Sequence, residues 1–82
     1  MPKTHDPQQL GPNVYRHYKT DSLYRVITDR AILTTNGPDD GRPAVVYVSL
    51  TNGHVFVRAF DEFYSAVDLP EGGSVLRFER AK

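Results

Sequence analysis

Cysteine and tryptophan are both absent from this chain of 82 residues. Without thiols the chain can form neither a disulfide framework nor a thiolate zinc site. Disulfides characterise oxidising compartments, so their absence favours a cytoplasmic location. A chain this short has room for one domain, and a deep hydrolase-type cleft is difficult to build at this size without covalent staples.

An excess of charge is also lacking, since ten basic and ten acidic residues give a formal net charge of zero. Non-specific affinity for nucleic acids depends on excess Lys and Arg, so the composition argues against a general nucleic-acid binder. Seven of the ten basic residues are Arg, which favours planar and stacked contacts. The composition is therefore still compatible with a locally basic recognition face.

No apolar run approaches the roughly 20 residues that cross a membrane, so we expect no membrane partner. Residues 1–12 are polar, contain three prolines and lack the apolar stretch of a signal peptide. We expect a flexible arm there and a single domain over residues 13–82. His5, His17 and His54 lack the paired spacing of a metal site, and we expect neither a metal nor a cofactor.

Short segments with strand composition alternate with turn residues along the rest of the chain. Residues 29–35 are ambiguous, because they could extend a strand or begin the Gly- and Pro-rich loop over 36–43. The pattern predicts a mainly β fold, a small five-stranded antiparallel barrel whose closure would remove exposed edges. The expected strands span residues 14–19, 23–28, 44–50, 55–59 and 74–80.

Residues 60–67 could form one short helical turn capped by Asp61, because Phe60, Phe63 and Val67 have helical spacing. A strand is the alternative. We expect these apolar side chains, with Tyr64, to pack in the core. A patch for another subunit, and hence a homo-oligomer, is the other interpretation.

Asn52-Gly53 predicts a two-residue type I′ hairpin loop, which would pair Leu50 with Val55 and Tyr47 with Arg58. Opposed residues share one face of a sheet. One predicted face is wholly apolar and is expected to be core: Val46, Val48, Leu50, Val55, Val57 and Ala59. The other face is mixed: Val45, Tyr47, Ser49, His54, Phe56 and Arg58.

Two interpretations of the mixed face remain open. Tyr47 and Phe56 could pack under a neighbouring element with Arg58 lying over Tyr47. Alternatively, the face could be a recognition surface, because Tyr and Arg dominate binding hot spots and aromatic rings accept stacked bases.

The opening strand interleaves aromatic and basic residues, as single-strand nucleic-acid platforms do, although an amphipathic edge strand has the same pattern. If Tyr18 pairs with Leu23, then Arg16 lies across from Arg25, and such like charges favour an anion or carboxylate between them. As a general base, His17 would need a nucleophile and an orienting carboxylate, so we expect a structural histidine.

Several segments resemble one known family. They are Val14-Tyr15-Arg16-His17-Tyr18-Lys19, Leu23-Tyr24-Arg25-Val26-Ile27, Val45-Val46-Tyr47, Val55-Phe56-Val57-Arg58 and Arg77-Phe78-Glu79. In this order they are similar to the bacterial family called domain of unknown function 1653, over roughly Asn13 to Arg80. Ala59 and Phe56 stand where that family usually has Pro and Trp. The resemblance implies an SH3-like or Sm-like barrel and no established activity.

Together these features predict a non-catalytic binding module for RNA or for a protein or peptide partner. A structural or homo-oligomerising protein is the alternative, followed by a small hydrolase that uses His17. The candidate binding residues are Tyr15, Arg16, His17, Tyr18, Lys19, Arg25, Tyr47, Phe56 and Arg58.

Overall fold

The computed structural model describes residues 13–81, and the predicted arm over residues 1–12 lies outside them. The fold is mainly β with one short helical turn, as predicted. The elements are β1 (Val14–His17), β2 (Leu23–Ile32), β3 (Pro43–Ser49), β4 (Val55–Ala59), α1 (Phe60–Phe63), β5 (Ala66–Asp68), β6 (Ser74–Leu76) and β7 (Phe78–Arg80).

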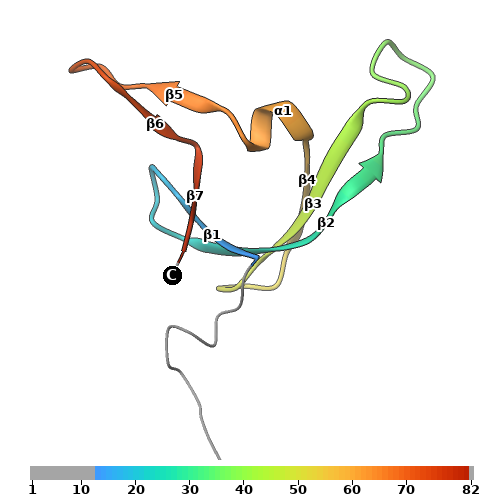
Figure 1. The fold of residues 1–82 in the computed structure, drawn as a ribbon. Coiled ribbons are helices and arrows are strands. Elements are labelled where there is room, and N and C mark those ends of the chain that lie inside the picture. The colour runs from blue at the N-terminus through green and yellow to red at the C-terminus, as the bar shows by residue number, and fades with distance from the viewer. Residues whose placement is uncertain (1–12, 82) are drawn as a thin grey trace, which may run out of the picture.

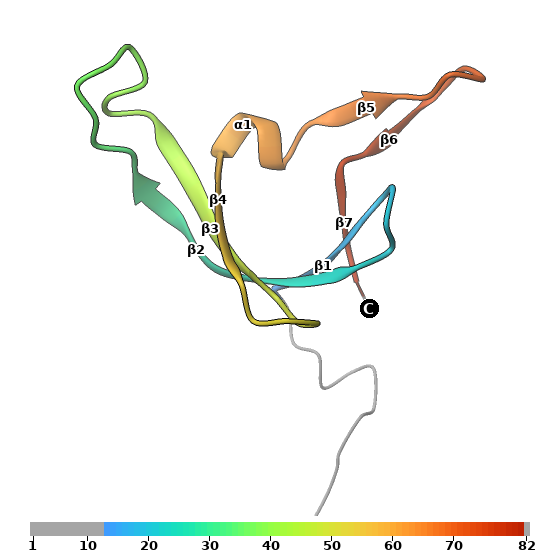
Figure 2. The same cartoon turned by 180° about the vertical axis from the view of Figure 1, so that it is seen from behind.

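The sheet is not closed into the predicted barrel. Five antiparallel strands follow the order β4-β3-β2-β1-β7, so β4 and β7 form two separate edges. The sheet curls, α1 lies across its open side, and the two-stranded β5–β6 sheet projects away (Figures 1 and 2). The strand predicted over residues 74–80 breaks at Arg77, and its first half pairs with β5. Only three residues remain to return along β1, which explains the missing closure.

The predicted hairpin between β1 and β2 is present, but its register differs from the one considered. Arg16 lies opposite Leu23, and Arg25 lies opposite Val14. The like charges therefore do not face each other. Arg16 instead pairs with the Asp21 carboxylate at 3.2 Å. The register thus removes the reason for placing an anion between the two arginines.

The β3–β4 hairpin also departs from the predicted two-residue loop. Val48, rather than Leu50, lies opposite Val55, and the connection is longer. The Ser49 hydroxyl accepts hydrogen bonds from the backbone N–H groups of Thr51 (3.1 Å) and Asn52 (3.3 Å). These two bonds stabilise a wider loop. Because the register moves by two residues, the residues predicted to share a face still share it.

The face expected to be core is the exposed one. Val55 and Val57 are 58% and 60% exposed, whereas Val45 and Tyr47 on the mixed face are 0% and 5% exposed. The sheet curls around its mixed face, and Phe63 of α1 is fully buried against this face. A single sheet in a short chain has only one face covered, and aromatic packing selects this face.

The loop between β2 and β3 is tied to α1 by charge. Arg42 lies 3.0 Å from the Asp39 carboxylate and 3.2 Å from that of Asp61. Ala59, not Asp61, is the residue that caps α1, and it makes no side-chain cap hydrogen bond. Within residues 13–81, no helix has the length and apolar character needed to span a membrane.

Candidate functional site

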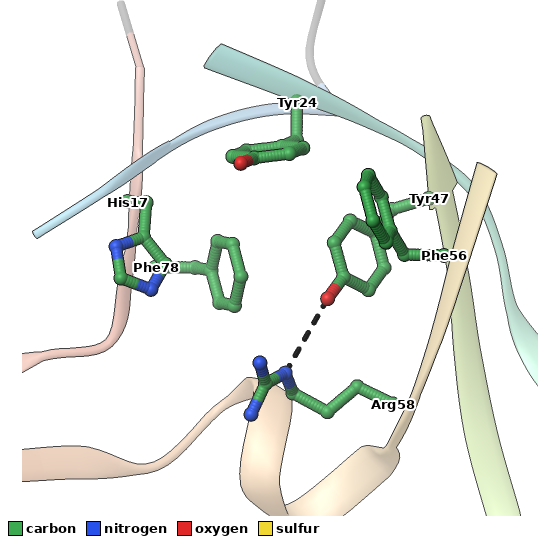
Figure 3. A pocket seen from close by; sticks show the side chains of 6 residues that line it. All are labelled: His17, Tyr24, Tyr47, Phe56, Arg58 and Phe78. Atoms are coloured by element: carbon green, nitrogen blue, oxygen red, sulfur yellow. Dashed lines mark hydrogen bonds between the residues drawn. The ribbon is translucent and has the colours of Figure 1, made fainter. Parts of the chain in front are cut away.

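The curled sheet holds a shallow hollow of about 150 Å³ on its concave face. Every strand of the five-stranded sheet contributes at least one side chain to it, and these side chains converge from different directions (Figure 3). The hollow therefore exists because the sheet bends. Its lining residues are His17, Tyr24, Tyr47, Phe56, Arg58 and Phe78.

Four aromatic rings form the wall of the hollow. The half-buried Tyr24 ring lies edge-on to Tyr47, Phe56 and Phe78, with centroid distances of 5.6, 6.1 and 5.7 Å. Tyr47 and Phe56 stack at 5.7 Å. The Phe56 side chain is 39% exposed. Ring edges and faces thus border the same space, which suits a planar apolar group.

Arg58 lies beside this aromatic wall (Figure 3). Its Nε donates a 3.3 Å hydrogen bond to the Tyr47 hydroxyl. Its guanidinium carbon lies 5.8 Å from the centre of the Phe78 ring. An Nη1 contact with the Glu62 carboxylate is long, at 3.8 Å. The guanidinium is therefore oriented by aromatic groups and only weakly paired with a carboxylate.

His17 completes the hollow with a neutral imidazole. Its ring packs edge-on against Phe78 at 5.0 Å, and its Nδ1 accepts a 3.2 Å hydrogen bond from the Lys19 backbone N–H. Burial lowers the pKa of His17, and the positive charges of Arg58, Arg77 and Lys19 lower it further. With Nδ1 accepting, the neutral ring carries its hydrogen on Nε2. His17 is therefore a hydrogen-bond donor among cations.

The chemistry of the hollow favours binding of electron-rich groups. The imidazole Nε2–H and the guanidinium N–H groups are donors, and the positive charges of Arg58, Arg77 and Lys19 act on the imidazole. These features suit a planar ligand with acceptor oxygens or negative charge. Among residues 13–81, no group of three or more His, Asp or Glu side chains could hold a metal ion.

Four of the nine predicted binding residues line the hollow: His17, Tyr47, Phe56 and Arg58. Lys19 is one of the cations whose charge lowers the pKa of His17, and Tyr18 stacks on His17 at 5.2 Å.

The other three predicted residues lie elsewhere. Tyr15 packs edge-on against the buried Phe63 at 5.4 Å and belongs to the core region. Arg16 forms an ion pair with the Asp21 carboxylate, and Arg25 lies opposite Val48, which belongs to the exposed apolar face. The structure does not bring these three side chains into the hollow.

Tyr24 and Phe78 line the hollow but were not among the predicted binding residues. Strand alternation offered a signal for Tyr24, because it lies opposite Tyr15 on the same face of the hairpin. Phe78 lies opposite His17. That pairing depends on which strand borders β1, which the local pattern does not specify.

A family model matches residues 13–80, and its description is "Protein of unknown function (DUF1653)". The chain belongs to this family. The DUF1653 match includes every strand and the helical turn described above, and it confirms the family that the sequence resembles. No curated protein and no solved structure matches the chain. The SH3-like or Sm-like character of this DUF1653 domain accordingly stays a prediction.

Proposed function

We propose that this DUF1653 domain is a non-catalytic binding module whose hollow accepts an unpaired base of single-stranded RNA with its phosphate. The observation that carries the proposal is the convergence of four aromatic rings with His17 and Arg58 around one space. The proposal includes an SH3-like or Sm-like fold for the curled sheet and a cytoplasmic location.

The size and polarity of the hollow support a nucleotide. A cavity on the order of 150 Å³ admits a single benzene-sized ring, and the hollow has about this volume. Base–aromatic stacking contributes about 1–3 kcal/mol per base, and it tolerates any base sequence. Lys19, Arg58 and Arg77 surround His17 and would attract the adjoining phosphates.

The direct test compares two phenylalanines of similar exposure. Phe56 in the hollow is 39% exposed, and Phe60, which packs on Tyr64 outside the hollow, is 38% exposed. Phe56→Ala should weaken binding of a labelled uridine octamer roughly 5- to 100-fold, because one stacking ring is lost. Phe60→Ala should bind as the wild type does. Fluorescence anisotropy at low salt measures both.

Equal affinities of the two variants for the octamer would contradict the proposal. Salt dependence separates RNA from the second candidate, a protein or peptide partner, which the exposed Val55 and Val57 favour. If three cations contact the phosphates of a single strand, raising the salt concentration from about 50 to 200 mM should weaken RNA binding roughly twenty-fold. Peptide binding through apolar contacts should change much less.

A further inference from the structure

We infer that β4 is a dimerisation edge, to which β4 of a second copy of this chain adds in antiparallel orientation about a two-fold axis at Val57. This inference does not rest on any ligand in the hollow. It rests on the backbone, the side chains and the exposure of β4.

Apart from the charged side chain of Arg58, which points into the hollow, the β4 edge lacks the features by which natural proteins protect edge strands. Such edges usually carry Pro, Lys or a bulge, or they are covered. β4 reads Val55-Phe56-Val57-Arg58-Ala59 and pairs with β3 in continuous register, without a bulge. It lies at the end of the strand order, and Val57 is 60% exposed. Its open side is therefore a template for another strand.

Hydrogen-bond alternation determines which backbone groups face outward. The Ser49 N–H donates to the His54 carbonyl oxygen at 2.9 Å, which makes this a hydrogen-bonded pair. Along an antiparallel ladder, hydrogen-bonded residue pairs alternate with pairs that are not hydrogen-bonded to each other. Phe56 and Arg58 therefore bond to β3. The N–H and C=O groups of the intervening residues point away from β3: Val55, Val57 and Ala59.

A two-fold axis at Val57 pairs all of these outward groups. Val57 then lies opposite Val57 of the second copy, and Val55 lies opposite the second copy's Ala59. An axis at Phe56 would instead place Ala59 opposite Gly53, which belongs to the hairpin loop. The axis at Val57 is the arrangement that uses the full length of the strand.

Charge selects the same register. With the axis at Val57, Phe56 lies opposite the second copy's Arg58, and an arginine over an aromatic ring is favourable. An axis at Arg58 would place two arginines directly opposite each other, which destabilises a sheet pair. On the outer face, the exposed Val57 side chains of the two copies contact each other and lose water.

The pairing also changes the hollow, because Phe56 and Arg58 line it. Each copy would bring its Arg58 next to the other copy's Phe56. The dimer would then have two hollows that share one continuous sheet, each with an added cation at its rim.

Sedimentation equilibrium over about 5 to 500 μM tests the inference, because an interface of short strands is expected to be weak. Wild type should show a concentration-dependent dimer. Val57→Lys should weaken it roughly ten-fold or more, since two ammonium groups meet at the axis. Ile27→Lys is the matched control, because Ile27 is 56% exposed and lies on β2, two strands from the edge. A purely monomeric wild type would overturn the inference, as would equal loss in both variants.

Hydrogen exchange of the wild-type protein provides a test without any variant. The amides of Val55, Val57 and Ala59 face solvent in the monomer and would be hydrogen-bonded in the dimer. Their exchange should slow as concentration rises, while the amides of Phe56 and Arg58 change less. Unchanged exchange of the three outward amides at concentrations where dimer is present would overturn the edge arrangement.

Discussion

At the scale of single residues, the surroundings of His17 decide both its charge and its use. The ring contacts Phe78, and its Nδ1 accepts the Lys19 backbone N–H. Protonation of Nδ1 would remove that hydrogen bond and add a charge beside Arg58 and Arg77. The neutral imidazole is therefore the form that fits this site.

The lowered pKa of His17 predicts how stability depends on pH. The unfolded chain, in which the pKa is about 6.5, binds protons before the folded protein does. The contribution of His17 is thus complete above pH 6.5 and is lost as pH falls toward the lower pKa of the folded state. The free energy of unfolding should fall less steeply between pH 7 and 5.5 in His17→Gln than in wild type. Urea unfolding at several pH values measures the slope, and identical slopes would contradict this assignment.

The residues of the hollow were partly predictable from sequence. Strand alternation predicts that Tyr47, Phe56 and Arg58 share one face, because shifting the strand register by an even number of residues keeps them on the same face. Phe78 could not be found this way, because its position beside His17 comes from the pairing of β7 with β1. Long-range strand pairing is not encoded in the local pattern.

At the scale of elements, the β3–β4 hairpin combines a predictable turn residue with an unpredicted loop length. Gly53 has φ of 78°, in the left-handed region. Its N–H donates to the Ser49 carbonyl oxygen at 2.9 Å. The hairpin therefore needs glycine at this position, although the Ser49 hydroxyl rather than a type I′ turn sets the loop.

Replacing Gly53 with alanine should cost about 1 kcal/mol of unfolding free energy, because a Cβ is unfavourable at positive φ. No atom lies within 4 Å of the added Cβ, so the cost is conformational rather than steric. Gly37→Ala is the control. Gly37 is not among the glycines with positive φ, and its nearest contact would be the Thr35 hydroxyl at 3.9 Å. Urea unfolding compares the two, and equal losses would contradict the role of Gly53.

The choice of core face shows the limit of prediction from a single hairpin. Alternation established which side chains share a face, and this part was confirmed. It did not establish which face the rest of the chain covers. Phe63 of α1 stacks on Phe78 at 4.2 Å over the mixed face. Aromatic packing between distant elements therefore outweighed the simpler expectation that the valine-rich face is buried.

At the scale of the whole molecule, the open sheet explains both proposals. Its strand order ends at β4 and β7, and both edges contribute side chains to the hollow. The break at Arg77 keeps the sheet open. The Arg77 N–H donates to the Ser65 carbonyl oxygen at 2.9 Å, and its carbonyl oxygen accepts from the Tyr18 N–H at 3.0 Å. One residue thus joins the two sheets, which a strand-composition pattern over residues 74–80 does not reveal.

The most direct test of the account is an NMR titration of the wild-type protein with a uridine octamer, observing side-chain and backbone signals together. Binding in the hollow predicts shifts at Tyr24, Phe56 and Phe78. It also predicts a rise in the pKa of His17, because a bound phosphate offsets the cations that lower that pKa. Shifts confined to Val55 and Val57 on the outer face would contradict the account, as would no shift at saturating RNA.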